Sequence, residues 1–256
     1  MATWQEFFAE LDRWPTGQAT FWWRDDDAIE PCRSLDRLLR LGDQPVAIAV
    51  IPANMRLSLA ESLESERVAV LQHGYSHANH EPNGAGESEL GSARPISVIL
   101  KELERGRRWL DKLFGCRFLP VLVPPWYRIG DSLACQLGAL GYTGLSTYGA
   151  RKATGARPTR VNVHSDIVDW HPKPRFLGRT RPRFLGTEAA LELVTGHLAA
   201  RRKGEADSDE PTGLVTHHLQ MDDACFAFAE EFLARSKGHP AVSWRAARDI
   251  FPSERG

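Results

Sequence analysis

Apolar positions follow a helical spacing in some segments of the chain and form short continuous runs in others. Spacings of three and four residues predict helices over residues 4–14, 35–39, 56–64, 96–114, 188–201 and 222–235. Continuous apolar runs predict strands over residues 20–24, 46–51, 68–71, 118–123 and 214–216. Between them, residues 81–95 are rich in Gly, Ser, Glu and Pro and are expected to form a loop.

The alternation of these strands and helices indicates the fold class. Strands joined by helices pair in parallel, either as a barrel or as a doubly wound sheet. The 256 residues, 42% of them hydrophobic, are enough for one large core. Residues 201–212 are expected to form a solvated loop rather than a domain linker, because helical and strand patterns resume on both sides. We therefore expect one α/β domain over residues 1–256.

The charge balance gives no overall attraction to a polyanionic partner, so any such attraction must be local. The chain has 32 basic and 33 acidic residues and a net charge of −1, so nothing draws it as a whole to nucleic acid or to an anionic membrane. Its four cysteines stand singly, without CxxC spacing, as is typical of reduced thiols in the cytosol. Acidic residues interrupt the apolar amino-terminal segment, and no apolar stretch approaches the ~20 residues that span a membrane. A cytoplasmic location is therefore expected.

Three carboxylates, Asp25, Asp26 and Asp27, stand side by side directly after the apolar run "FWW". Like charges this close raise one another's pKa, so the arrangement is unfavourable unless a cation or a shared proton relieves it. A run of aspartates is more often a solvated turn or a helix cap. A metal ion would relieve the repulsion, and histidines at other strand ends, described next, favour that interpretation.

Two further strand ends carry histidines. "HGYSH" follows the strand at 68–71, and its His73 and His77 are four residues apart, so both can reach one ion if the segment turns helically. "VTHH", residues 215–218, ends another apolar strand. The carboxyl ends of parallel strands face one common mouth, so the aspartates and histidines can meet there. One Asp and two His leave coordination positions open, which is the pattern of a catalytic rather than a structural ion.

In this order, "RDDDA", "HGYSH", "VPPW", "SDIVDW" and "VTHH" resemble the five motifs of the NodB-homology polysaccharide deacetylases. The resemblance covers residues 20–218. It implies a distorted (β/α) barrel of mostly parallel strands. It also implies a metal-dependent hydrolase that removes N-acetyl groups from a carbohydrate, either a polysaccharide or a sugar precursor.

The first two motifs imply the metal ligands and the general base. "DDA" stands where the family has Asp-Asp-Gly, so the resemblance makes Asp26 the general base and Asp27 a metal ligand. A shift of one residue, to Asp25 and Asp26, stays open. His73 and His77 match the two histidine ligands. The ion is most simply Zn²⁺, given one carboxylate and two imidazoles.

The later motifs imply the acid and the acetyl pocket. His217 matches the histidine that protonates the leaving group, and Asp169 matches the carboxylate that orients it. Trp126 and Trp170 are expected to wall the acetyl pocket. Because the last motif has a second histidine at 218 where the family has aspartate, which imidazole faces the metal stays open.

One feature departs from the family pattern. The third motif usually begins with an arginine that pairs with the catalytic aspartate, but Val123 stands before the two prolines here. Arg24 or Arg128 is expected to substitute, and Arg128 is also a candidate for substrate binding. Two other hypotheses remain: a carbon–nitrogen hydrolase acting on a non-sugar amide, and a carbohydrate-binding protein with a decayed site. The missing arginine favours the decayed site.

A basic segment over residues 151–183 has two interpretations. It is either a solvated loop or a surface that recognises a phosphate or carboxylate on the substrate, as in a nucleotide-linked or lipid-linked sugar. Three aromatic residues, Trp170, Phe176 and Phe184, lie among its charges. Its nine basic residues are Arg151, Lys152, Arg157, Arg160, Lys173, Arg175, Arg179, Arg181 and Arg183. The remaining histidines, including His164 and His197, are expected at the surface or just behind the site.

Overall fold

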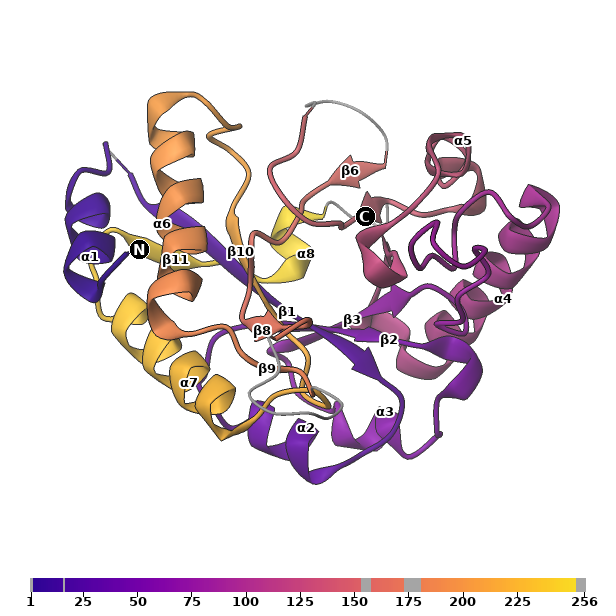
Figure 1. Ribbon diagram of the computed structural model, residues 1–256. Helices are drawn as coiled ribbons and strands as arrows, with labels where there is room; N and C mark the ends of the chain where they lie inside the picture. Colours follow the sequence, from indigo (N-terminus) through magenta and orange to yellow (C-terminus); the bar gives the residue numbers. More distant parts are fainter. Residues whose placement is uncertain (1, 16, 153–157, 173–180, 252–256) are drawn as a thin grey trace.

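A curled sheet of parallel strands forms the centre of the computed structural model (Figure 1), which describes residues 2–15, 17–152, 158–172 and 181–251. The strand order is β6-β5-β4-β3-β2-β1-β10-β7, with β11 beside the start of β1. The strands are β1 (Ala19–Ala28), β2 (Val46–Val50), β3 (Val68–His73), β4 (Phe118–Val123), β5 (Gly144–Leu145), β6 (Thr159–Arg160), β7 (Ser165–Asp166), β10 (Thr212–Thr216) and β11 (Val242–Trp244). Two short strands, β8 (Val168–Asp169) and β9 (Arg183–Phe184), pair antiparallel outside it.

One segment, residues 159–166, curls the sheet toward closure. Its first part pairs with β5 and its last part pairs with β10. Between them, the Val163 N–H donates to the Thr147 carbonyl at 3.1 Å and the His164 N–H donates to the Gly213 carbonyl at 2.8 Å. A chain that changes partner in this way joins the two edges of the sheet. The predicted distorted (β/α) barrel of mostly parallel strands is therefore confirmed.

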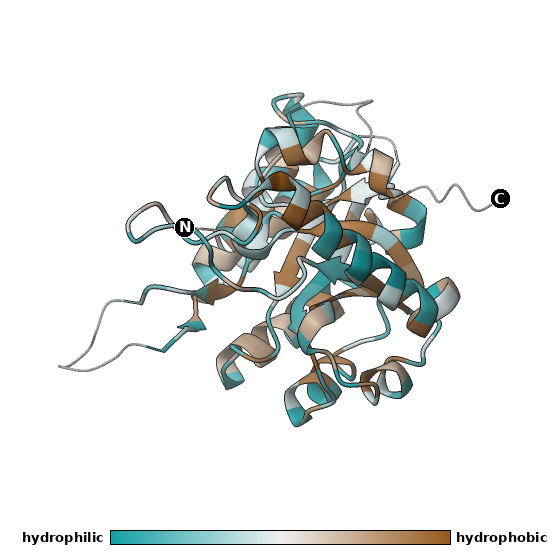
Figure 2. Ribbon diagram, turned by 90° about the vertical axis from the view of Figure 1, so that its right-hand side faces the viewer, coloured by the Kyte–Doolittle hydropathy of each residue, from teal (hydrophilic) through white to brown (hydrophobic). Residues whose placement is uncertain are grey.

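Helices cover the outside of this sheet (Figure 1). They are α1 (Trp4–Asp12), α2 (Arg33–Leu38), α3 (Leu59–Ser62), α4 (Ile96–Phe114), α5 (Asp131–Ala134), α6 (Thr187–Lys203), α7 (Asp223–Lys237) and α8 (Ala247–Ile250). The 3₁₀ turns are η1 (Pro52–Asn54), η2 (Gly115–Arg117), η3 (Pro125–Tyr127) and η4 (Gly138–Leu140). Figure 2 shows that the helix surfaces on the α4 side carry many hydrophilic residues. No described helix is both long enough and apolar enough to cross a bilayer.

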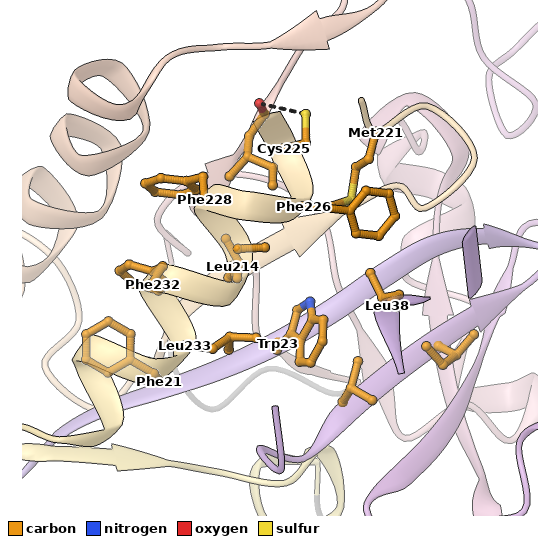
Figure 3. Close-up of a cluster of buried hydrophobic side chains, with 14 of the residues drawn as sticks. Phe21, Trp23, Leu38, Leu214, Met221, Cys225, Phe226, Phe228, Phe232 and Leu233 are labelled. Atoms are coloured by element: carbon orange, nitrogen blue, oxygen red, sulfur yellow. Dashed lines mark hydrogen bonds between the residues drawn. The ribbon is translucent and has the colours of Figure 1, made fainter. Parts of the chain in front are cut away.

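Side chains on β1 point alternately to the helices and to the barrel interior. Phe21 and Trp23 pack outward with the apolar face of α7 (Figure 3), where they join the larger core cluster. Trp22 points inward, and its ring lies 5.7 Å from that of Phe251 in a T-shaped contact. Burying an aromatic side chain of this size contributes about 1.5–3 kcal/mol. Because the period is two, Arg24 and Asp26 continue the inward row toward the mouth of the barrel.

Candidate metal centre and active site

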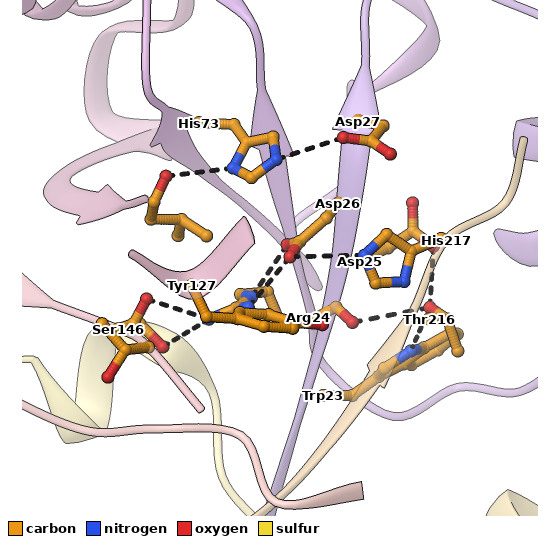
Figure 4. Close-up of polar contacts among 12 residues, drawn as sticks. Trp23, Arg24, Asp25, Asp26, Asp27, His73, Tyr127, Ser146, Thr216 and His217 are labelled. Atoms are coloured by element: carbon orange, nitrogen blue, oxygen red, sulfur yellow. Dashed lines mark hydrogen bonds and ion pairs between the residues drawn. The ribbon is translucent and has the colours of Figure 1, made fainter. Parts of the chain in front are cut away.

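The end of β1 brings two neighbouring aspartates to the same side. The register of β1 against β2 shifts between Asp25 and Ala28, which marks a bulge. Within it, Asp27 has a φ of 73°, a left-handed conformation that Asp tolerates better than most residues. In a regular strand Asp26 and Asp27 would face opposite sides, whereas here both reach the mouth (Figure 4).

His73, at the end of β3, and His77, four residues later, meet Asp27 across the end of β2, which lies between β3 and β1. The His73 Nδ1–H donates to the Val123 carbonyl at 3.0 Å, so the lone pair of its ring is on Nε2. That Nε2 lies 3.1 Å from Asp27 Oδ1, and His77 Nε2 lies 3.3 Å from the same oxygen. We call Asp27, His73 and His77 the mouth cluster, and their ligand atoms all lie within 4.8 Å of one another.

A buried carboxylate holds the turn that carries His77. Glu89, 1% exposed, accepts hydrogen bonds from the backbone N–H groups of Tyr75, Ser76 and His77, the shortest at 2.7 Å. It also accepts from the Ser76 hydroxyl at 3.0 Å. Sequence reasoning missed Glu89, because nothing distinguishes it from other acidic residues of the loop at 81–95. Only the fold shows that it fixes the second histidine.

The mouth cluster fits a divalent cation. Asp27 Oδ1 is buried and receives no well-aligned hydrogen bond within the described residues, although two imidazole nitrogens face it. Burial opposes ionisation of Asp27, but its contact with His73 and the charges of His73, His217 and His77 hold its pKa well below the usual range. The separations of 3.1 and 3.3 Å match the roughly 3.4 Å between ligand atoms bound tetrahedrally to Zn²⁺ at ~2.1 Å.

Arg24 supplies the guanidinium that the third motif lacks. Its Nε–H and Nη2–H donate to the two carboxylate oxygens of Asp26 at 2.8 and 2.9 Å, and both side chains are buried. A third donor bonds the Ser146 hydroxyl at 2.6 Å. Arg128, the other expected substitute, instead directs its guanidinium to the Glu87 carbonyl at 3.4 Å. Residues 24 and 26 share a face of β1, which is the signal that identifies the pair.

His217 lies between two carboxylates at the end of β10. Its Nε2 is 3.8 Å from Asp26 Oδ2, and its Nδ1 is 3.8 Å from Asp166 Oδ1. Asp166 Oδ2 accepts hydrogen bonds from the Tyr127 hydroxyl at 2.9 Å and the Trp170 indole at 2.8 Å. The Trp170 ring also contacts His217 edge-on, at 4.7 Å between centroids.

The prediction that Asp169 orients His217 was wrong about this contact. Asp166 belongs to β7, which pairs in register with β10 and so lies beside the strand that leads to His217. Asp169 belongs to β8, which leaves the main sheet and pairs with β9. Its carboxylate accepts from the His171 N–H at 3.2 Å and lies 3.8 Å from Arg183. The change of strand between residues 166 and 168 separates the two carboxylates.

Asp25 and His218 form a separate buried pair. The two side chains are joined at 2.5 Å through His218 Nδ1, and the His218 backbone N–H donates to Asp25 at 3.1 Å. Burial opposes protonation of His218, but the charge of Asp25 and their hydrogen bond raise its pKa. Asp25 is thereby occupied, so Asp27 is the aspartate that faces the histidines. Likewise His217, and not His218, faces Asp26.

The two tryptophans expected around the acetyl group lie on two sides of these residues. Trp126 has a φ of 54°, and its ring lies 4.4 Å from that of His77. Trp170 lies against His217, as described above. Arg128 lies with the loop at residues 84–87. Its role in substrate binding therefore stays a prediction.

A second group of similar residues lies at the other end of the barrel. His164, His197 and Glu210 are buried near the first residue of β10, and we call them the amino-end cluster. The two imidazole rings are stacked 3.3 Å apart, and their Nε2 atoms lie 3.4 and 4.0 Å from Glu210. The expectation that both histidines lie at the surface or behind the site was wrong.

The hydrogen bonds of the amino-end cluster argue against a metal ion. The Gly213 N–H donates to His164 Nδ1 at 2.9 Å, so the proton of the neutral ring is on Nε2. That nitrogen therefore has no lone pair to offer a metal. Burial, together with the charges of His164 and Arg201, lowers the pKa of His197 to about 2. The cluster is a group of neutral imidazoles beside a buried carboxylate.

The described part of the basic segment makes contacts within the protein. Arg151 lies 2.6 Å from Asp207 and donates to the Arg160 carbonyl at 2.9 Å. Arg183 faces Asp169, as above. Five residues of this segment lie outside the described ranges: Arg157, Lys173, Arg175, Phe176 and Arg179. Recognition of phosphate by this segment stays a prediction.

The fold was compared with known proteins. No protein-family model and no curated protein matches the sequence. A candidate polysaccharide deacetylase from Mycobacterium smegmatis superposes with a TM-score of 0.59 at 18% identity, over 92% of this chain and 90% of its own. The Bc1960 peptidoglycan N-acetylglucosamine deacetylase, solved with a hydroxamic acid, superposes with a TM-score of 0.56 at 14% identity, over 95% and 96%. The chain has the polysaccharide deacetylase fold.

The same fold is also found in a protein described as a pseudoenzyme. A mutant of a pseudoenzyme of carbohydrate esterase family 4 superposes with a TM-score of 0.53 at 12% identity, over 93% of this chain and 68% of its own. The resemblance inferred from the five motifs is thus confirmed at the level of fold. Whether a polysaccharide deacetylase fold is active depends on its site residues, not on its architecture.

Proposed function

We propose that this chain is a metal-dependent hydrolase that removes N-acetyl groups from a carbohydrate. One observation carries the proposal. Asp27, His73 and His77 converge on one point with separations of 3.1 and 3.3 Å, and a carboxylate and an imidazole, Asp26 and His217, face each other at 3.8 Å beside it. A metal cluster next to an acid–base pair is the equipment that amide hydrolysis requires.

The mouth cluster would hold the metal ion. One carboxylate and two imidazoles suit Zn²⁺ most simply, although the choice of metal is part of the proposal. A divalent ion bound there would polarise the acyl carbonyl and lower the pKa of a water molecule. The hydrogen bond from His73 to the Val123 carbonyl fixes the ring so that Nε2 faces the cation.

Asp26 would act as the general base. Arg24 fixes the carboxylate through both of its oxygens. Each oxygen of a carboxylate has two lone pairs, so a second acceptor position remains for the proton of the attacking water. A fixed carboxylate loses little entropy when it takes that proton, which is the advantage of positioning.

His217 would act as the general acid. An amide nitrogen does not leave as an anion, so it must receive a proton as the carbon–nitrogen bond breaks. Asp166 lies 3.8 Å from His217 Nδ1 and would stabilise the imidazolium that donates this proton. The Trp126 backbone N–H would donate to the tetrahedral oxyanion.

Arg24 also weakens the case for a decayed site. That hypothesis rested on the missing arginine of the third motif, and the guanidinium of Arg24 makes a bidentate pair with Asp26 at 2.8 and 2.9 Å. Because a protein described as a pseudoenzyme has the same fold, the decayed-site hypothesis still needs a direct test of activity. The non-sugar amide hydrolase would use the same residues, so only substrate screening separates it from the deacetylase.

The test is acetate release from N-acetylated sugars, free and phosphate-linked, with protein stripped of metal and then supplied with zinc. We expect turnover only after zinc is added. Asp26→Asn and His217→Ala should each lower it by roughly 10²–10⁴-fold. Acetate release that persists after a chelator has removed the metal would contradict the proposal, and so would tight sugar binding without turnover. If only non-sugar acetamides were turned over, the proposed substrate class would be wrong, whereas the proposed metal-dependent hydrolysis would still hold.

A matched pair of variants tests the corrected role of Asp166. Asp166→Asn should lower turnover about a hundredfold, because the imidazolium of His217 loses its stabilising charge. Asp169→Asn makes the same chemical change three residues away and should stay within about threefold of the parent chain. The comparison uses kcat at saturating zinc and substrate. A larger effect at 169 than at 166 would restore the original assignment.

A further inference from the structure

A groove lies between α4 and η1. It encloses about 670 Å³, within the range typical of small-molecule sites. Gly106, in the middle of α4, makes it possible. A Cβ at this position would lie 2.9 Å from Pro52 and 2.6 Å from Gln72, so any side chain would push η1 away from the helix. A mid-helix glycine costs about 1 kcal/mol relative to alanine, which indicates that this close approach matters.

Basic residues form one wall of the groove. Lys101, Arg105, Arg108 and Lys112 all line it and are spaced four, three and four residues apart, so they share one face of α4. They span about 16 Å of helix. The only acidic residue that lines the described groove, Glu104, is already paired with Arg108 at 2.6 Å. Basic side chains are therefore concentrated along this groove, although the whole chain has nearly equal numbers of acidic and basic residues.

Aromatic rings complete the groove. Trp109 is 39% exposed although it is one of the largest apolar side chains, and it lies between the basic residues. The guanidinium of Arg105 lies 5.9 Å above the ring of Tyr75. Flat rings beside cationic groups suit a ligand that combines apolar ring faces with negative charge. A sugar ring with a carboxylate or phosphate has this chemistry.

The groove and the candidate active site are connected by one short segment of the chain, residues 73–77. Tyr75 lines the groove, and it is the middle residue between His73 and His77. Its backbone N–H is bonded to Glu89, which also holds His77. A ligand in the groove thus lies against the segment that joins His73 to His77, two residues of the mouth cluster.

We propose that this groove binds the anionic group of an acidic carbohydrate, either a carboxylate or a phosphate. The assignment of the ligand as a carbohydrate rests on the proposed function. Binding itself does not require turnover. The groove would make the protein prefer acidic over neutral N-acetylated sugars, because a neutral sugar offers no negative charge to the basic wall of the groove.

The test measures binding by calorimetry at low salt, with two anionic probes and their neutral counterparts. The anionic probes are an oligogalacturonate and N-acetylglucosamine 1-phosphate. The neutral ones are a chito-oligosaccharide and N-acetylglucosamine. We expect at least one anionic probe to bind about tenfold or more tightly than its neutral counterpart and to weaken as salt is added. The anionic probe that binds identifies the group as carboxylate or phosphate.

Two double variants with equal charge change locate the site. Lys101→Glu with Arg105→Glu should weaken binding of the anionic probe at least about tenfold. Arg33→Glu with Arg40→Glu changes two exposed residues, one at the start of α2 and one just after its end, and should have less than about a twofold effect. Trp109→Ala should weaken binding about threefold to tenfold without removing a charge. Thermal melting of each variant checks that the fold is retained.

Several outcomes would overturn the proposal. Equal losses in the two double variants would mean that net charge alone attracts the probe. Binding of neutral sugars as tightly as acidic ones would remove the preference, and tighter binding of a single-stranded DNA oligonucleotide at the same residues would replace the carbohydrate. If acidic sugars bind in the groove but no acetate is released from any substrate, the proposed binding site is retained and only the proposed deacetylase function is contradicted.

Discussion

The mouth cluster and the amino-end cluster contain the same residue types but differ in chemistry. Each has two buried or half-buried histidines and one carboxylate within 4.8 Å. In the mouth cluster, the backbone carbonyl of Val123 takes the Nδ1 proton of His73 and leaves Nε2 free to bind. In the amino-end cluster, the backbone N–H of Gly213 occupies Nδ1 of His164 and forces the proton onto Nε2. A single hydrogen bond to the backbone therefore decides which cluster can accept a cation.

Their positions on the strands explain the difference. The mouth cluster lies at the carboxyl ends of β1 and β3, where the chain leaves the sheet and side chains reach the mouth of the barrel. The amino-end cluster lies where residues 159–166 close the sheet against β10. There, backbone groups are committed to pairing and side chains fill the interior. Similar residues thus serve binding at one end and closure at the other.

Loss of one histidine from each cluster should separate these roles most strongly. His73→Gln should weaken zinc binding by more than about a hundredfold, because it removes an imidazole ligand. His164→Gln should leave zinc affinity within about twofold and lower the stability of the fold instead. Zinc affinity is measured by competition with a chromophoric chelator, and stability by urea unfolding. Loss of zinc affinity in the His164 variant would reverse the comparison.

Acid should destabilise the fold through the amino-end cluster. Because burial holds the pKa of His197 at about 2, the unfolded chain takes up a proton below its usual pKa of ~6.5 and the folded chain does not. Stability should therefore fall as the pH drops, by about 1.6 kcal/mol or roughly fifteenfold between pH 6.5 and 5 from this group alone. Urea unfolding at several pH values should show a weaker dependence for His197→Gln. An unchanged dependence would mean that His197 is not the neutral group.

A variant of Glu89 tests whether the support of His77 matters for metal binding at the mouth cluster. Glu89→Gln removes the charge that gathers three backbone N–H groups, so the turn carrying His77 loosens. We expect zinc affinity to fall about tenfold, as is typical when a group behind a metal ligand is changed. Glu87→Gln, an exposed position in the same loop, is the matched control and should have no measurable effect. Equal zinc affinity in the two variants would limit Glu89 to a role in folding.

Long elements could be predicted from the sequence, and short ones could not. The helix over 96–114 and the strand over 118–123 have the predicted bounds, because their apolar periodicity or continuity is strong. The two-residue strands β5 to β9 are too short for a periodic pattern. They exist because a neighbouring strand offers a partner, which only the assembled fold reveals. The predicted first strand ended at residue 24 because three aspartates follow, whereas β1 continues to Ala28.

The site shows the same division. Asp27, His73 and His77 could be grouped in advance, because the ends of parallel strands converge whatever the details of the fold. Choosing Asp166 over Asp169 required knowing that the chain leaves the sheet between them. Arg24 was considered as a partner of Asp26, and the period of the strand supports the choice. Glu89 depends on a contact between a loop and a turn that no local pattern encodes.

The location of a bound zinc ion tests the central claim most directly. Crystals grown with one equivalent of Zn²⁺ should give a single strong anomalous peak at the zinc edge, about 2.0–2.2 Å from Asp27 Oδ1 and from the Nε2 atoms of His73 and His77. A peak between His164, His197 and Glu210, or no peak at the mouth cluster despite saturating zinc, would contradict the account.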